Sequence, residues 1–246
     1  MTHLTAIIKR ELASYFVGPM AVVFITVFIV ALGLLTFTIG GWFEAEQANL
    51  EVFFSFHPWV YLFFLPALSM RLWAEERRNG SIELLLTLPI HLSTIVVGKF
   101  LAAWAMAGIA LALTGPIWVS VNYLGTPDNG VILASYLGSF LMAGGYLALG
   151  SVLSALTRNQ IIAFILTVAV SFILTISGVP MVLDTLRLIV PDMVIEGIAS
   201  ISFLVHFRAI TAGVIDGRDL VFFTSLIAVC LALTAIIVDL KKAEGA

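Results

Sequence analysis

Charged residues are scarce in this chain of 246 residues, and their scarcity sets its class. Only 11% of the residues are Asp, Glu, Lys or Arg, whereas 61% are hydrophobic and the mean hydropathy is +1.12. Such a composition is typical of an integral membrane protein built from helices. The sequence lacks the alternating ten-residue segments of an outer-membrane barrel. We therefore expect an all-α membrane protein.

Motifs for catalysis, metal binding and phosphate binding are also missing. The sequence contains no G-x-x-x-x-G-K-[ST] phosphate loop, because Gly98-Lys99 lacks both the earlier glycine and the hydroxyl residue. H-E-x-x-H and G-x-S-x-G are absent too. The single cysteine, Cys230, lies in an apolar run and is expected only to fill space. We expect no catalytic residue, no metal and no cofactor bound by this chain, and no nucleic-acid partner.

Carboxylates are absent from the middle of every long apolar run. Six runs are long enough to cross a membrane, at residues 20–40, 52–70, 100–121, 131–156, 161–179 and 220–238. A carrier driven by protons or sodium normally keeps buried carboxylates for its coupling ion. The sequence therefore disfavours an ion-coupled carrier, and the energy for any transport has to come from elsewhere.

One charged stretch, residues 71–90, interrupts the chain between the second and third runs. It holds three arginines and three glutamates, which cannot lie in hydrocarbon because a central charge costs about 2.5–3.5 kcal/mol. Asn79-Gly80-Ser81 predicts a turn and an N-cap, a leucine-rich run follows, and Pro89 ends it. We predict a short surface helix that offers apolar side chains to a cytoplasmic partner. The alternative is a solvated anchor for two membrane helices.

Two further segments complete the expected fold. Residues 2–17 predict an amphipathic helix that lies in the membrane interface. Its apolar face comprises Leu4, Ile7, Ile8, Leu12 and Tyr15. Residues 180–219 are too interrupted for a span and too apolar for an aqueous loop, so they predict short helices of a re-entrant element buried against the outer side of the bundle.

The sequence also predicts the surroundings or local structure of three residues in or beside the runs. His57 lies near the outer end of the second run and is interpreted as an interfacial polar side chain rather than a ligand. Pro66 is expected to kink the same run, because proline removes an internal hydrogen bond. Lys99 is placed at the inner mouth of the third run, which is interrupted at Gly115-Pro116. Small residues in the fourth run predict close helix packing.

The distribution of basic residues predicts the orientation. With six spans and the amino terminus inside, nine of the 12 Lys and Arg residues face the cytoplasm and three face outward. The positive-inside rule therefore favours a multi-pass protein with both termini in the cytoplasm. We expect it in the bacterial inner membrane.

The order of these segments resembles the permease subunits of ABC-2-type transporters. The pattern that carries the resemblance is Ala74-Glu-Glu-Arg-Arg-Asn-Gly-Ser-Ile-Glu-Leu-Leu-Leu-Thr-Leu-Pro89, between the second and third spans. A second stretch, His206-Phe-Arg-Ala-Ile-Thr-Ala-Gly-Val-Ile-Asp-Gly-Arg-Asp-Leu220, is similar to the gliding-motility (GldF-like) branch. The nitrous-oxide-reductase maturation permeases (NosY-like) are near relatives. The similarity covers essentially the whole chain.

The resemblance implies one ABC-2-type transmembrane domain over residues 1–246, working as a dimer with a second permease copy or a paralogue. Each half would be engaged by a separate ABC ATPase, which binds ATP and Mg, through a coupling segment at residues 74–89. The residues implied to couple to the ATPase are Glu75, Glu76, Arg77, Arg78, Asn79, Gly80, Ser81, Ile82, Glu83 and Leu85. The implied function is an ATP-driven permease, with export expected on family grounds.

The sequence does not identify the cargo. In this family the second and fifth spans line the dimer axis, which gives Phe56, Tyr61, Phe64, Phe164 and Phe172 as a translocation-path lining. An aromatic lining favours an amphiphilic or lipid-linked cargo, or mechanical work without passage. Further expected contacts are membrane lipid and an extracytoplasmic GldG-like partner. The alternative function is a non-transporting membrane anchor or scaffold for an extracytoplasmic complex.

Overall fold

Every regular element that the structure describes is helical. The computed structural model describes residues 3–80, 90–188 and 190–243. Four helices within these ranges are long and apolar enough to cross a membrane, and the number rises to six if each of two bent helix pairs counts as one span. The expectation of an all-α membrane protein is therefore confirmed.

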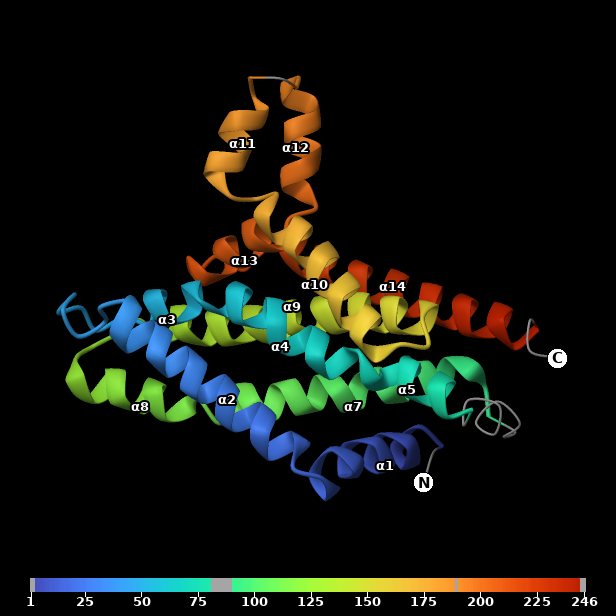
Figure 1. Cartoon of the computed structure of the whole chain (residues 1–246). Coiled ribbons are helices and arrows are strands. Elements are labelled where there is room, and N and C mark those ends of the chain that lie inside the picture. The colour runs from blue at the N-terminus through green and yellow to red at the C-terminus, as the bar shows by residue number, and fades with distance from the viewer. Residues whose placement is uncertain (1–2, 81–89, 189, 244–246) are drawn as a thin grey trace.

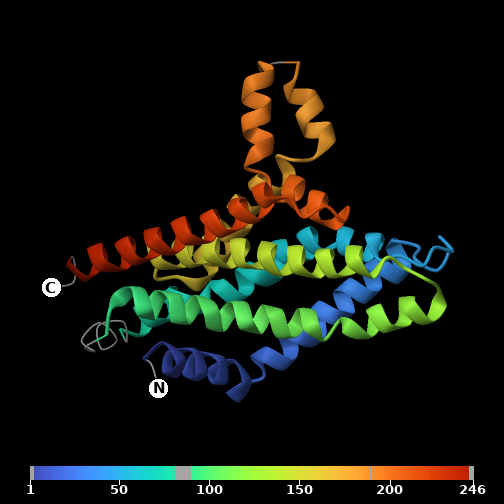
Figure 2. The same ribbon diagram turned by 180° about the vertical axis from the view of Figure 1, so that it is seen from behind.

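Helix α9 (Asn129–Leu156) is the centre of the bundle (Figures 1 and 2). The helices that pack on it include α4 (His57–Ser69), α7 (Leu92–Ala112), α10 (Gln160–Ile176) and α14 (Gly217–Ala243). The glycines of α9 permit this close packing: a Cβ atom at Gly144 would lie 2.8 Å from Ile227 Cδ1 and 3.0 Å from Trp104 Cε2. The predicted role of small residues in helix packing is thus confirmed at Gly144.

Two of the predicted membrane runs are broken where a proline starts a new helix. Helix α8 (Gly115–Leu124) follows α7 and carries Pro116 in its first turn, as expected. The second run consists of α3 (Glu51–Ser55) and α4, with Pro58 in the first turn of α4. The break at Phe56 lies before Pro66, where the kink was predicted. Helix α4 continues through Pro66 without ending there. A proline in a first turn breaks no intrahelical hydrogen bond, which favours a helix start at Pro58.

The first helix packs against the bundle. Helix α1 (His3–Val17) lies along α7 and is followed by α2 (Met20–Leu34) and a π-helical turn, η1 (Leu35–Ile39). Gly98 of α7 makes room for α1, because a Cβ atom there would lie 2.7 Å from Ile7 Cγ2. The predicted apolar face of α1 is its less exposed side. That face therefore docks on α7.

Helices α11 (Pro180–Leu186) and α12 (Asp192–Ser200) project from the bundle as a hairpin (Figures 1 and 2). The chain bends by 75° between α10 and α11 and by 69° between α12 and α13 (Phe203–Thr211). Within the described part of the hairpin only Ile195 is buried, whereas α13 packs its apolar side on α9. The expected burial against the bundle thus holds for α13 and is wrong for the hairpin. Charged residues such as Asp184 interrupt the apolar pattern of the hairpin.

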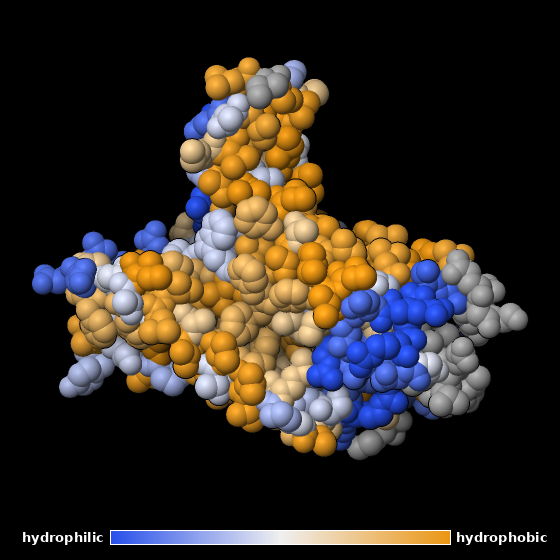
Figure 3. Space-filling model, viewed as in Figure 1, coloured by the Kyte–Doolittle hydropathy of each residue, from blue (hydrophilic) through white to orange (hydrophobic). Residues whose placement is uncertain are grey.

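The two ends of the bundle differ in chemistry. We call one the charged end; it contains α5 (Arg71–Asn79), the start of α7 and the end of α9, and the start of α1 and the end of α14 lie there too (Figure 1). We call the other the loop end; it contains residues 40–50 and 125–128. Hydrophilic side chains gather over the charged end, whereas the middle of the bundle is mostly hydrophobic (Figure 3).

Candidate functional site

Helix α5 extends the second run beyond its apolar part, after a break at Met70. It ends at Gly80, whose φ of 70° lies in the left-handed region that glycine adopts without steric cost. The predicted turn at residues 79–81 is therefore confirmed at Gly80. Four predicted coupling residues, Ser81, Ile82, Glu83 and Leu85, lie outside the described residues, as does the surface helix expected there.

Serine hydroxyls of α9 hold the junction between α4 and α5. Ser154 Oγ accepts hydrogen bonds from the backbone amides of Trp73 and Ala74, both at 3.1 Å, and donates to Met70 O at 2.9 Å. The amide of Trp73 lies in the first turn of α5, where amides have no intrahelical acceptor, so Ser154 supplies one. The Trp73 indole also donates to Ser151 Oγ at 3.0 Å. Helix α9 therefore fixes where the membrane helix ends and α5 begins.

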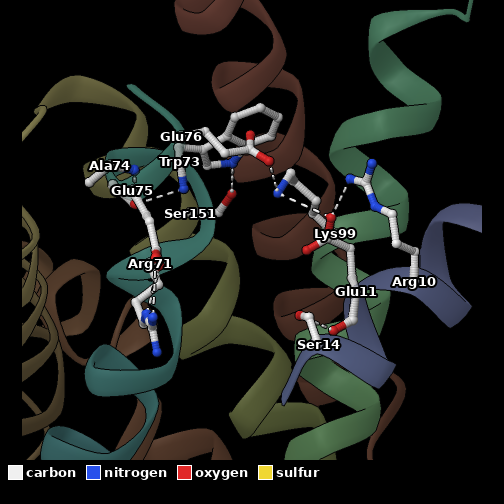
Figure 4. Close-up of polar contacts among 11 residues, drawn as sticks. Arg10, Glu11, Ser14, Arg71, Trp73, Ala74, Glu75, Glu76, Lys99 and Ser151 are labelled. Carbon is white, nitrogen blue, oxygen red and sulfur yellow. Dashed lines mark hydrogen bonds and ion pairs between the residues drawn. The ribbon is translucent and has the colours of Figure 1, made fainter. Parts of the chain in front are cut away.

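A buried lysine joins α5 to two other helices (Figure 4). Lys99 Nζ of α7 lies 2.7 Å from Glu76 Oε1 of α5 and 3.5 Å from Glu11 Oε1 of α1. Its side chain is only 4% exposed, and Nζ lies 5.5 Å from the centre of the Trp73 ring. Arg10 also pairs with Glu11, at 2.6 Å. Because an unpaired buried charge is costly, these pairs hold the three helices together. We call Glu11, Glu76 and Lys99 the ionic joint.

The two neighbouring carboxyls of α5 have opposite surroundings. Glu75 pairs with Arg71 one turn earlier, at 2.7 Å, and this hydrogen bond holds the pKa of the Glu75 carboxyl below its usual value. Burial raises the pKa of the Glu76 carboxyl, although the nearby Lys99 ammonium opposes part of that rise. Glu76 therefore takes up a proton at higher pH than Glu75 does.

Two neighbouring arginines of α5 also differ in their surroundings. Arg77 Nη1 donates to Ala155 O at 2.7 Å, which places its positive charge at the carboxyl end of α9, where the helix dipole favours it. Arg78, Asn79 and Gly80 are exposed. The structure thus shows Glu76 and Arg77 contacting helices of this chain. Contact of the predicted coupling residues with an ATPase stays a prediction.

The five aromatic residues predicted to line a path have different surroundings. Tyr61 is 2% exposed and stacks on Phe28 at 5.9 Å, and Phe64 lies 5.7 Å from the same ring. Phe56 and Phe164 are half-buried. Phe172 is 42% exposed. Their role as a lining stays a prediction.

His57 is not an interfacial side chain, and that expectation is wrong. It is completely buried and packs against rings that include Phe53 and Phe54, at 4.7 and 5.1 Å between ring centres. Its Nδ1 lies 3.0 Å from Phe53 O. Because the break at Phe56 starts α4 at His57, the imidazole enters the aromatic core instead of the membrane surface.

Sequence reasoning missed the residues that receive α5: Glu11, Lys99, Ser151 and Ser154. Lys99 was expected at the mouth of a span beginning at Phe100, but α7 begins at Leu92 and encloses it. The apolar residues between 92 and 98 were the available signal for this earlier start. The two serines, three residues apart and so on one face of α9, gave a weaker signal. Within the described residues, no group of three or more His, Cys, Asp or Glu side chains could hold a metal ion.

Comparison with known proteins places this architecture in a family. A family model described as "ABC-2 family transporter protein" matches residues 42–238. The chain belongs to this family. ABC-2 membrane subunits are typically non-catalytic, and the matched range includes α5 and every helix after it to within a few residues of the carboxyl end.

A relative with a known name matches a shorter stretch. Heme exporter protein B of Paracoccus denitrificans (strain Pd 1222) is 36% identical over 67 residues, which are 27% of this chain and 31% of that protein. The match therefore spans less than a third of the length of the relative. Together the family and this relative support a transmembrane transporter subunit.

Proposed function

We propose that this ABC-2 family protein is the permease subunit of an ATP-driven exporter, which couples ATP hydrolysis on a separate ABC ATPase to cargo movement or mechanical work. Family membership implies the ATPase partner. The observation that carries the proposal is the ionic joint, which ties α5 to α1 and α7. The segment from Glu75 through Leu85 meets the ATPase, and Glu76 and Arg77 position it from within the chain.

Force applied to α5 has two defined routes into the membrane helices. One passes through Lys99 to α7 and α1, and the other passes through Ser154 and Ala155 to α9. The contacts of Glu76 with Lys99 and of Arg77 with Ala155 O are both 2.7 Å, so α5 cannot move without moving or breaking them. An ATPase that displaces α5 therefore tilts several spans together.

The remaining features of the proposal follow from charge and family. The charged end faces the cytoplasm of the inner membrane, because it carries most of the basic residues. The protein acts as a dimer with a second copy or a paralogue. The GldF-like branch belongs to the same proposal and rests on the sequence from His206 to Leu220, within which His206 lies 2.6 Å from Asp219. A GldG-like extracytoplasmic partner belongs to this proposal.

The cargo that we propose is amphiphilic or linked to a lipid. The predicted lining residues, of which Phe172 is 42% exposed, are aromatic and would not solvate a small hydrophilic solute. The name of the partial relative, a heme exporter, agrees with export of a molecule with a large apolar body.

A glycine substitution tests the proposal. The complex would be purified with the phosphate-loop ATPase that is co-expressed from the same gene neighbourhood, and ATP turnover would be measured in nanodiscs. Gly80→Pro is expected to insert normally but to abolish the effect of the permease on ATP turnover, because proline cannot adopt the positive φ that ends α5. Gly213→Pro, at another positive φ on the loop end, is the control. Unchanged stimulation in Gly80→Pro would contradict the proposal.

The second candidate is a non-transporting scaffold for an extracytoplasmic complex. The projecting hairpin favours it, because Met181, Leu188 and Met193 expose 79–85% of their surface and are available to a partner. Co-purification decides between the two functions. Recovery of a large partner without any ATPase would favour the scaffold.

A further inference from the structure

A cavity of about 700 Å³ opens at the loop end, away from the ionic joint. Its walls come from three parts of one chain: the region of α3 and the start of α4, the start of α9, and α13. The volume falls within the range of about 300–1,000 Å³ that is usual for small-molecule sites. The cavity is therefore large enough for a ligand and needs no second subunit to form it.

Buried apolar side chains form part of every wall of the cavity, beside polar ones such as Ser135 and Thr211. The buried side chains that line it are Leu50, Phe54, Ile132, Leu204 and Phe207, each at most 3% exposed. These residues come from all three walls, so each wall contributes apolar side chains. Such a surface favours an acyl chain or another apolar body over a hydrophilic solute.

The rim of the cavity carries both signs of charge. Arg208 is exposed, lines the cavity and forms no ion pair within the part of the chain that the structure describes. Glu51 and Asp128 lie on the same lining and are also exposed. Asp128 Oδ1 accepts from the amides of Gly130 and Val131, at 2.8 and 3.2 Å, and so caps α9. A ligand that carries both charges could pair its anionic group with Arg208 and its cationic group with Glu51 and Asp128.

Helix α13 is locked in the orientation that brings Arg208 to the cavity. On its other side, His206 Nδ1 lies 2.6 Å from Asp219 Oδ1 of α14, and Nε2 lies 2.9 Å from Ser200 O. The His206 ring stacks on Phe222 with 4.0 Å between centres. The stretch that begins at His206 therefore has two faces, one that fixes α13 to α14 and one that lines the cavity.

We propose that this cavity binds a zwitterionic phospholipid, with its phosphate on Arg208, its ammonium group beside Glu51 and Asp128, and the first part of an acyl chain in the apolar interior. An arginine guanidinium holds a phosphate with two parallel hydrogen bonds. A purely anionic headgroup would lie beside two carboxylates, and a purely cationic one would lie beside Arg208. The binding site stands independently of the proposed transport function, because it requires neither nucleotide nor an ATPase.

Lipid binding to the purified full-length chain tests this site. Native mass spectrometry would measure retention of phosphatidylethanolamine, phosphatidylglycerol and uncharged diacylglycerol, each added separately in detergent. Arg208→Gln is expected to weaken phosphatidylethanolamine binding by about ten-fold or more, since it removes a charge-assisted contact. Arg218→Gln is the control, because Arg218 is an exposed arginine near the same end but outside the cavity lining.

A second pair of variants separates the headgroup from the apolar interior. Ser55→Trp fills the cavity from an exposed position on its lining, and it should abolish retention without changing any charge. Glu51→Gln should narrow the preference for phosphatidylethanolamine over phosphatidylglycerol. Equal retention of all three lipids, retention that survives Ser55→Trp, or no retention by the unmodified chain would each overturn the proposal. A photoreactive group on the first carbons of the acyl chain that labels only residues outside the lining would also overturn it.

Discussion

Lys99 at the charged end and Arg208 at the loop end are both cations on helices of the bundle, but their surroundings differ. Lys99 is enclosed and has two carboxylate partners from α1 and α5. Arg208 is exposed at the rim of a cavity and has no ion-pair partner among the described residues. A cation whose partners lie within the chain holds helices together, whereas a cation without such a partner is available to a ligand. The surroundings of Lys99 therefore suit a site that holds helices together, and those of Arg208 suit a site that binds a ligand.

The largest expected effect comes from Lys99→Met, which keeps the length of the side chain and removes its charge. Glu76 and Glu11 would then lie close together without the ammonium between them, and loss of one partner of a buried pair costs about 3–5 kcal/mol. Thermal unfolding of the full chain in detergent would measure the loss. Lys9→Met, on the exposed side of α1, is the matched control.

A double variant sharpens this result. Adding Glu76→Gln to Lys99→Met removes the second buried charge, so the double variant should be more stable than Lys99→Met alone. If the double variant is instead as unstable as the sum of the two single variants, the ionic joint does not act as a pair. The assignment of Lys99 as the link between α5 and α7 would then be wrong.

Ser154→Ala should have a smaller effect on the same end. The substitution leaves the amide of Trp73 without its acceptor, which costs about 1–3 kcal/mol for a buried group. Ser225→Ala removes an exposed hydroxyl bonded only to its own helix and should be nearly neutral. Limited proteolysis within residues 81–89 would report whether α5 loosens from α9. Equal cleavage in both variants would show that Ser154 does not hold the α4–α5 junction.

Arg208→Gln should leave stability almost unchanged, in contrast with Lys99→Met. An exposed cation without an ion pair contributes within about 0.5 kcal/mol to folding. The same thermal unfolding measurement serves both variants, and only lipid retention should fall in Arg208→Gln. A large destabilisation would show that Arg208 has a structural role and would remove the distinction between the two ends.

Much of the fold follows from local signals in the sequence. The apolar runs locate the long helices, and the charged stretch locates α5. The end of α5 at Gly80 also follows from the sequence, because glycine readily adopts the positive φ found there. The partners of Lys99 do not follow, because Glu11 and Glu76 come from distant segments and any exposed carboxylate offers the same local pattern. The burial of His57 was missed for a related reason, since it depends on a helix break at Phe56 that was not predicted.

Residues 180–210 were the harder segment to predict. They are mostly apolar with five scattered charged residues, and this pattern fits a buried element and an exposed one equally well. Only the packing of α13 on α9 separates its buried residues from those of the projecting hairpin. The cavity is likewise invisible in the sequence, because its three walls lie far apart along the chain.

The smallest expected effect is a difference in titration between Glu75 and Glu76. The lowered pKa of Glu75 means that its stabilising contribution is present above the unfolded-state pKa and is lost as pH falls. The raised pKa of Glu76 has the opposite effect on stability. The folded state favours the protonated carboxyl, so the stabilisation that Glu76 contributes at low pH is lost as pH rises. Carboxyl ¹³C shifts, assigned with Glu75→Gln and Glu76→Gln, should therefore show Glu76 protonating first on acidification. The reverse order would mean that Lys99 outweighs burial, and that the ionic joint survives to lower pH than the Arg71–Glu75 pair.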